Sequence, residues 1–131
     1  MPRPKSEHPT RGELEVLKLL WQRGPCSVRQ VWEVLNRQRR RHYTSTASLL
    51  AAMAEKGLLA SDVRGRTLIY RALAAQEKTL GRMVEDLLQR AFSGSASALV
   101  LRVLDQCHPS PEEMGEIAKI LRKHRKEQGE K

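Results

Sequence analysis

Aromatic side chains are scarce in this chain of 131 residues, which has two tryptophans, two tyrosines and one phenylalanine. Its core must therefore consist mainly of aliphatic side chains, a composition that favours helices. Long apolar runs are also absent, and none approaches the ~20 residues that a membrane-spanning helix requires. Residues 1–9 form a polar arm with no hydrophobic segment behind it, so we expect no signal peptide.

Cysteine is rare as well. Cys26 and Cys107 lie far apart and match no metal-ligand or redox spacing, so we expect reduced thiols in a cytoplasmic protein. The four histidines are scattered, and the adjacent pair Cys107-His108 does not make a catalytic dyad or a metal site. The glycines form no phosphate-binding loop. The sequence thus predicts no enzyme activity, no metal and no cofactor.

Acidic residues are few in the first part of the chain, and this makes the charge uneven. Residues 1–73 carry 14 Lys and Arg against 6 Asp and Glu, whereas residues 74–131 carry 10 against 9. Almost all of the net charge of +9 therefore lies in the first part. A localised positive field attracts phosphate backbones or anionic membranes. On charge alone, a basic surface that serves solubility is the alternative.

Two helices with strong start signals are predicted first. Thr10 and Glu13 have the spacing of a capping box, and apolar residues then recur at helical spacing until Gly24-Pro25 ends the pattern. Ser27 and Gln30 repeat the capping box before a second apolar face. These two helices and the one that follows predict a trihelical core.

The third helix is predicted over Thr44–Lys56, with Gly57 as its C-terminal glycine. One face is expected to pack on the first two helices and holds Thr46, Leu49, Leu50 and Met53. The opposite face has only short side chains, namely Thr44, Ser45, Ala47, Ser48, Ala51 and Ala52. Such a face fits a DNA major groove about 12 Å wide, where hydroxyls contact phosphates or base edges and methyls contact thymine. An ordinary surface helix is the alternative, although such helices usually expose Lys and Glu.

Arginines flank this helix on two sides. One group precedes it, and a second group surrounds Gly65 in the turn of a predicted hairpin with strands over residues 58–63 and 67–73. We expect the first group to approach phosphates, and the hairpin tip to meet an adjacent phosphate or the minor groove. The candidate DNA-binding residues are Arg39, Arg40, Arg41, Tyr43, Thr44, Ser45, Ala47, Ser48, Arg64 and Arg66.

The rest of the chain is predicted to be helical. A strong helix start, Ser110-Pro111-Glu112-Glu113, precedes its last helix. Its apolar stripes exceed what so short a bundle can bury, and pairing with a second copy is the simplest solution. We therefore predict a DNA-binding domain over residues 1–73 and a dimerisation domain over 74–131. The candidate dimerisation residues are Leu80, Met83, Val84, Leu87, Leu88, Leu99, Leu101, Val103, Leu104, Met114, Ile117 and Leu121.

An ordered set of short segments carries a family resemblance over about residues 10–122. The segments are Leu14-Glu15-Val16-Leu17, Leu20-Trp21, Gly24-Pro25, Ser27-Val28-Arg29-Gln30-Val31, Tyr43-Thr44-Ser45-Thr46, Ser48-Leu49-Leu50, Lys56-Gly57-Leu58-Leu59, Gly65-Arg66 before Tyr70, Ser97-Ala98-Leu99-Val100 and Ser110-Pro111-Glu112-Glu113. No single piece is specific, but the set resembles the penicillinase-repressor family, which also includes methicillin-resistance and copper-transport repressors.

The resemblance implies a mainly α fold, in which a winged helix-turn-helix domain of three helices and a small antiparallel β-wing precedes a helical dimerisation domain. It also implies a homodimer that binds a two-fold operator in double-stranded DNA and blocks transcription. The recognition helix would be Thr44–Lys56, with the wing around Gly65-Arg66. Its reading face would consist of Thr44, Ser45, Ala47 and Ser48.

The chain departs from the family at three places. Members cleaved by a membrane sensor-protease, a partner that the resemblance also implies, have Asn-Phe where this chain has Arg102-Val103. Copper-responsive members end in Cys-x-Cys pairs, whereas this chain has only Cys107. Ala51-Ala52 stands where relatives usually carry a polar residue and an arginine. Two other functions stay open, a winged-helix protein-interaction module and a nonspecific nucleic-acid binder.

Overall fold

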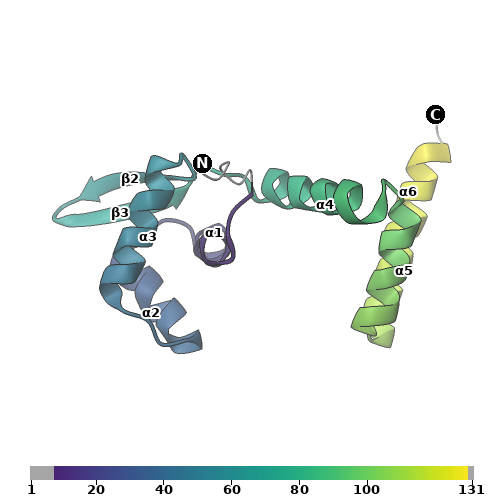
Figure 1. The fold of residues 1–131 in the computed structure, drawn as a ribbon, viewed down its shortest axis with the longest axis horizontal. Coiled ribbons are helices and arrows are strands. Elements are labelled where there is room, and N and C mark those ends of the chain that lie inside the picture. The colour runs from purple at the N-terminus through teal and green to yellow at the C-terminus, as the bar shows by residue number, and fades with distance from the viewer. Residues whose placement is uncertain (1–7, 130–131) are drawn as a thin grey trace, which may run out of the picture. The chain divides into compact units, whose positions relative to one another are not determined.

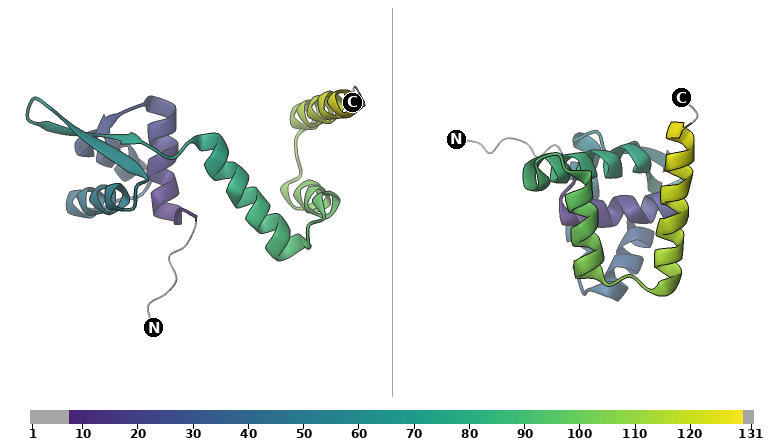
Figure 2. Two further views of the ribbon diagram at one scale, coloured as in Figure 1. Left: turned by 90° about the horizontal axis from the view of Figure 1, so that it is seen from above. Right: turned by 90° about the vertical axis from the view of Figure 1, so that its right-hand side faces the viewer.

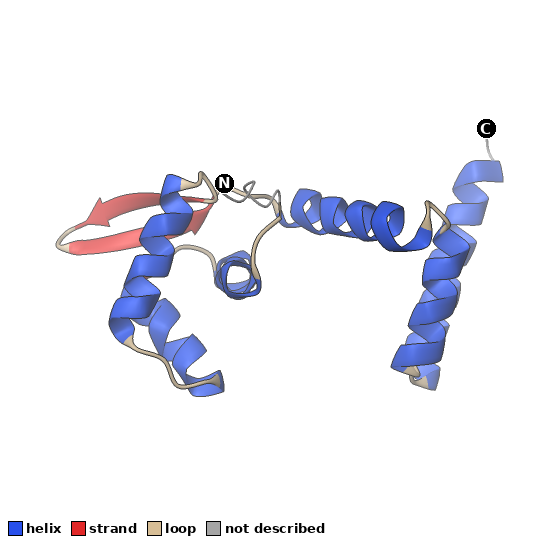
Figure 3. Ribbon diagram, viewed as in Figure 1, coloured by secondary structure: helices blue, strands red, loops and turns tan. Residues whose placement is uncertain are grey.

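The computed structural model describes residues 8–129, so most of the predicted polar arm lies outside the described residues. The chain divides into two compact units, residues 1–85 and 86–131. Helix α4 crosses the boundary between the units. The elements are α1 (Arg11–Arg23), β1 (Cys26–Ser27), α2 (Val28–Gln38), α3 (Tyr43–Glu55), β2 (Leu59–Arg64), β3 (Thr67–Ala72), α4 (Gln76–Phe92), α5 (Ala96–Cys107) and α6 (Pro111–Gly129). Figures 1 and 3 show the helices and the hairpin formed by β2 and β3.

Both predicted capping boxes are confirmed. The Thr10 hydroxyl accepts a hydrogen bond from the Glu13 backbone N–H at 3.2 Å, and Glu13 Oε1 accepts one from the Thr10 N–H at 2.9 Å. Ser27 and Gln30 make the same reciprocal pair at the start of α2, at 3.2 and 2.8 Å. Gly24 ends α1 with a φ of 84°. Local sequence signals thus determine where the first two helices begin and where α1 ends.

The recognition-helix prediction was shifted by one residue at each end. Helix α3 covers Tyr43–Glu55 rather than Thr44–Lys56, because His42 is its extended N-cap and Lys56 its C-cap. The predicted inner face is confirmed. Thr46, Leu50 and Met53 are buried, and Leu49 packs against the core as a partly buried residue.

Helix α3 ends in the paired hydrogen bonds of a Schellman motif. The Leu58 N–H donates to the Met53 carbonyl at 3.0 Å and the Gly57 N–H to the Ala54 carbonyl at 3.1 Å. Gly57 has a φ of 83°, in the left-handed region. The chain can therefore reverse from α3 into β2 within a few residues.

Replacing Gly57 by alanine should lower the free energy of unfolding by about 1–2 kcal/mol, the cost of holding an L-residue in the left-handed region. A Cβ there would meet open space, so backbone strain is the only cost. Urea unfolding measures the change. The control is Gly12→Ala in helix α1, where a Cβ meets only Leu49 Cδ2 at an ordinary 3.9 Å. Equal effects of the two substitutions on the free energy of unfolding would contradict the left-handed conformation assigned to Gly57.

The sheet has three strands in the order β1-β3-β2, all antiparallel. The predicted hairpin is confirmed, although its strands run over Leu59–Arg64 and Thr67–Ala72 rather than residues 58–63 and 67–73. Gly65 supplies the positive φ, 64°, at the first central position of the two-residue turn, as type II′ hairpins require. In Figures 1 and 2 the hairpin tip projects beyond the helices of its unit.

One hydrophobic core holds the first unit together. It lies between α1, α2, α3 and the inner side of the sheet, the arrangement of a winged helix. Its fully buried side chains come from all three helices and β2. The core residues are Val16, Leu17, Leu19, Leu20, Cys26, Val31, Leu35, Leu50, Met53, Leu59 and Tyr70.

The chain leaves the sheet along a fixed path. The N–H groups of Leu73 and Ala74 both donate to the Leu58 carbonyl, at 2.8 and 3.3 Å. The Ala74 carbonyl in turn accepts a hydrogen bond from the Trp21 indole Nε1 at 2.8 Å. The two residues that lead towards α4 are therefore tied both to α1 and to the start of β2.

In the second unit, α5 and α6 run antiparallel, as the right-hand view of Figure 2 shows in green and yellow. Ser95 caps α5 through the Ala98 N–H at 3.2 Å. The predicted start of the last helix is confirmed, with the Ser110 hydroxyl accepting from the Glu113 N–H at 3.1 Å and Pro111 as the first helical residue. Among the described residues of α4, α5 and α6, none is buried.

Candidate nucleic-acid interface

The outer face of α3 presents short side chains to solvent. Its exposed positions include two hydroxyl residues in the first turn, a serine one turn later and two alanines, with Ala47 half-buried. The first charged residue of this helix is Glu55, so no charged side chain precedes the last turn. The exposed set is Thr44, Ser45, Ser48, Ala51 and Ala52.

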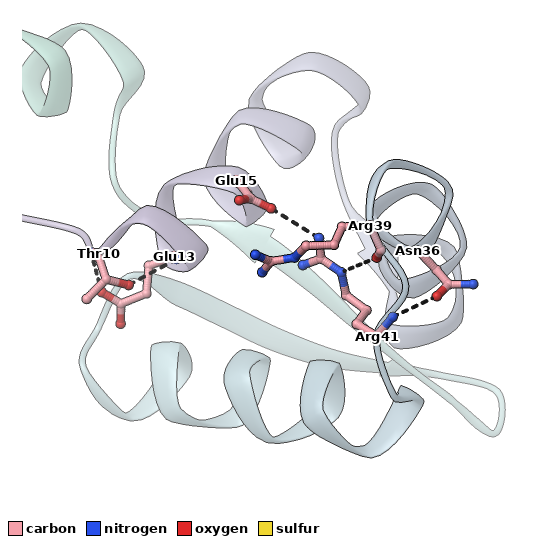
Figure 4. Close-up of polar contacts among 6 residues, drawn as sticks. All are labelled: Thr10, Glu13, Glu15, Asn36, Arg39 and Arg41. Atoms are coloured by element: carbon pink, nitrogen blue, oxygen red, sulfur yellow. Dashed lines mark hydrogen bonds and ion pairs between the residues drawn. The ribbon is translucent and has the colours of Figure 1, made fainter.

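The three arginines before α3 do not share one environment. Arg39 and Arg40 are exposed to solvent. The Arg41 side chain is only 15% exposed, and its Nη2 lies 3.3 Å from Glu15 Oε2 on α1. Figure 4 shows the Arg41 guanidinium between Glu15 and the Arg39 carbonyl. Arg41 thus differs from Arg39 and Arg40 in being largely buried and paired with a carboxylate.

Tyr43 opens α3 and packs against α2. Its ring meets that of Trp32 edge to face, with ring centroids 5.7 Å apart and planes at 68°. The Trp32 indole Nε1 also donates to the Arg41 carbonyl at 2.9 Å. Tyr43 is still 43% exposed, so part of its ring remains accessible beside the first turn of the helix.

The hairpin carries its two candidate arginines at the tip. Arg64 and Arg66 are exposed on either side of Gly65. Behind them Val63 and Leu68 are direct cross-strand partners, 71% and 38% exposed. The tip thus combines two cations with an apolar pair, and it belongs to the same compact unit as α3.

A buried carboxylate lies under the other end of α3. The Glu13 side chain is 5% exposed, and its Oε2 accepts a hydrogen bond from Lys56 Nζ at 2.7 Å. Burial alone would raise the pKa of this carboxyl. The hydrogen bond and the charge of Lys56, together with the Thr10 backbone N–H, reverse that effect and lower the pKa below its ordinary value. Glu13 is therefore ionised at neutral pH and joins α1 to α3.

The predicted dimerisation residues lie on helices whose apolar faces are uncovered. Seven of them are exposed in the chain as described: Leu80, Val84, Leu87, Leu101, Val103, Met114 and Leu121. The other five are half-exposed: Met83, Leu88, Leu99, Leu104 and Ile117. Val100 on α5 and Ile120 on α6, which the sequence prediction did not include, are likewise 44% and 55% exposed. These fourteen residues are called the C-terminal apolar surface below.

The described part of the chain offers no group of three or more His, Cys, Asp and Glu side chains placed to hold a metal. Cys26 is buried and its Sγ lies 3.4 Å from the Gly24 carbonyl oxygen. Burial raises the pKa of this thiol, against a smaller opposing effect of the Arg23 charge. Searched over the same described residues, no helix has the length and apolar character to span a membrane.

Comparison with known proteins shows to which family the chain belongs. The profile of the penicillinase repressor family matches residues 9–123. The penicillinase repressor of Bacillus licheniformis is 25% identical over 113 residues, which cover 86% of this chain and 88% of that protein. The transcriptional regulator BlaI of Mycobacterium tuberculosis is 32% identical over 99 residues, 72% of each chain.

The fold has solved counterparts at lower sequence identity. A MarR family protein from Bacillus stearothermophilus matches 92% of this chain and 75% of its own, with a TM-score of 0.50 and 22% identity. That likeness concerns the winged-helix fold alone. Since the family profile covers nearly the whole chain, the protein belongs to the penicillinase repressor family of transcriptional regulators, whose members are not enzymes.

Proposed function

We propose that this protein is a repressor that binds a two-fold DNA operator as a homodimer. The exposed face of α3, free of charged side chains before Glu55, is the observation that carries the proposal. Short side chains let a helix approach base edges in the major groove. Thr44, Ser45 and Ser48 then lie near base edges and phosphates, with Ala47 beside them.

Arginines around α3 supply the contacts to the DNA backbone. In the proposal, Arg39 and Arg40 neutralise phosphates at the start of the recognition helix, beside Tyr43. Arg64 and Arg66 bring the wing to the next stretch of backbone. Contacts of this kind fix register and orientation without reading sequence. The role of Arg41 is treated separately below.

The C-terminal apolar surface is proposed to hold two copies together. Nine exposed and five half-exposed apolar side chains in one chain favour association, because burial of apolar surface drives it. A two-fold dimer presents two identical recognition helices, which suits an operator made of two half-sites. In these terms residues 1–73 are the DNA-binding domain and residues 74–131 the dimerisation domain.

Selection of bound sequences from random duplex DNA tests the reading face. The wild type should enrich a motif made of two inverted half-sites, and Ser45→Ala or Ser48→Ala should change the preferred base at defined positions. The same change at an exposed serine outside the winged-helix unit, Ser97→Ala on α5, should leave the motif intact. Binding without any enriched motif would indicate a nonspecific binder, and no binding an interaction module.

The wing arginines should behave differently in the same assay. Arg64→Ala and Arg66→Ala are expected to weaken binding to all sequences alike. Each lost phosphate contact should also reduce the slope of log affinity against log salt by about 0.9. If either arginine substitution changes the enriched motif instead, that arginine reads bases rather than phosphates.

A further inference from the structure

Helix α1 places one carboxylate at each end of the recognition helix. Glu15 Oε2 lies 3.3 Å from Arg41 Nη2, just before α3 begins. Glu13 Oε2 lies 2.7 Å from Nζ of Lys56, the residue that caps α3 at its C-terminus. Two cations of the basic half of the chain are therefore paired within the protein, one on either side of the helix that we propose reads DNA.

Arg41 is also the residue that holds the connection between α2 and α3. Its backbone N–H donates to Asn36 Oδ1 at 2.9 Å, and its carbonyl accepts from Trp32 Nε1 at 2.9 Å. Its side-chain Nε donates to the Arg39 carbonyl at 3.2 Å. Figure 4 shows three of these contacts around Arg41, those with Glu15, Asn36 and Arg39. Both its backbone and its guanidinium are thus engaged with neighbouring elements.

The start of α3 has no cap of its own. His42, the N-cap, makes no side-chain capping bond, and the first turn contains no acidic residue. The first two helices, by contrast, begin with reciprocal capping boxes. The start of α3 therefore lacks a local side-chain cap, and Arg41 connects it to Asn36 and Trp32 of α2 and to Glu15 of α1.

Pulling Arg41 away to a phosphate would carry a cost. The side chains of Arg41 and Glu15 are only 15% and 27% exposed, so breaking the pair leaves a partly buried carboxylate without its partner. Arg40 is exposed beside it and reaches solvent without such a loss. A phosphate near this connection is therefore better served by Arg40 than by Arg41.

We infer that Arg41 and Lys56 are positioning residues, which fix the two ends of α3 on Glu15 and Glu13 of α1, and that they are not phosphate ligands. The inference rests on the proposed DNA-binding function. Arg41 was predicted to contact the DNA backbone, whereas in this inference it holds α3 in the position from which its exposed face reads the bases. It also gives α1 a part in sequence recognition without any contact to DNA.

The test compares two neighbouring arginines that lose the same charge. Arg40→Gln should reduce the salt slope by about 0.9, on the selected operator and on random DNA alike. Arg41→Gln should leave the salt slope unchanged. It should instead lower the ratio of operator affinity to random-DNA affinity by about tenfold, because a tilted α3 still attracts DNA but no longer fits the base edges.

Glu15→Gln separates the two roles most sharply. This near-isosteric change removes a negative charge and releases Arg41. If Arg41 were a phosphate ligand, Glu15→Gln would raise affinity and steepen the salt slope. As a positioning pair, Glu15→Gln should lower the affinity ratio about as much as Arg41→Gln does, and the double variant should be no worse than either single one.

The C-terminal end of α3 is tested by Lys56→Gln. Its charge-matched control is Lys18→Gln, at an exposed position of α1. Lys56→Gln should lower the affinity ratio without changing the salt slope, and the control should change neither. If Arg41→Gln or Lys56→Gln reduces the salt slope as much as Arg40→Gln does, the inference is overturned for that residue. A wild type that does not prefer any sequence overturns the proposed function instead, so the two failures are distinguishable.

Discussion

Leu121→Glu is expected to convert the protein into a monomer whose affinity for a two-half-site operator falls by roughly 10²–10⁴, the advantage that linked binding sites give. Leu121 is 60% exposed on α6 within the C-terminal apolar surface. A carboxylate there has no partner when the surface is covered by a second copy, and burying it unpaired is unfavourable. Light scattering gives the mass, and gel-shift titration on operators with one and two half-sites gives the affinities.

Affinity for a single half-site should change little, since α3 and the wing belong to the other unit. Gln106→Glu is the matched control, because it makes the same charge change at an exposed position of α5. It should remain dimeric. A Leu121→Glu protein that is still a dimer and still binds two half-sites tightly would remove α6 from the proposed interface.

Leu50→Ala is expected to lower the free energy of unfolding by about 2–5 kcal/mol. Leu50 is fully buried on the inner face of α3, and truncation leaves a cavity between helices that a small core fills poorly. Since domains are stable by only about 5–15 kcal/mol, the loss is a large fraction of the total. Urea unfolding followed by the fluorescence of Trp21 and Trp32 measures it.

Leu73→Ala provides the comparison, because it removes the same atoms from a side chain that is 50% exposed in the same unit. Its effect should stay within about 0.5 kcal/mol. If the two substitutions cost the same, the core is not centred on the inner face of α3. A loss of DNA binding in Leu50→Ala without a loss of stability would likewise contradict a packing role.

The elements that the sequence predicted well are those specified by neighbouring residues. Reciprocal caps at Thr10 and Ser27 and the left-handed Gly57 and Gly65 act within a few positions, so their signals can be read from the chain itself. The inner face of α3 followed from the helical period, because buried positions recur every three to four residues. The ends of α3 were each wrong by one residue, since His42 has no recognisable capping side chain.

Features that depend on distant residues were not predictable. Strand β1 is two residues long, too short for any period, and exists because Cys26 and Ser27 pair with β3. The pair of Arg41 with Glu15 joins positions 26 residues apart. Nothing local distinguishes Arg41 from Arg39 and Arg40, so the run was interpreted as one basic group. The roles of individual residues at the DNA interface and in the dimer stay predictions.

The hydrogen-bonded connection between β3 and α4 bears on the spacing of the two half-sites in the proposed operator. A flexible linker lets two DNA-binding domains adjust to several half-site separations. Here the Leu58 carbonyl and the Trp21 indole hold the backbone at Leu73 and Ala74, and only Ala75 lies between Ala74 and the start of α4 at Gln76. The connection therefore leaves little free chain between the sheet and α4. In the proposed dimer, so short a connection would limit the half-site separations that fit, and the length of DNA between half-sites would become part of the recognised sequence, even though no side chain touches those base pairs.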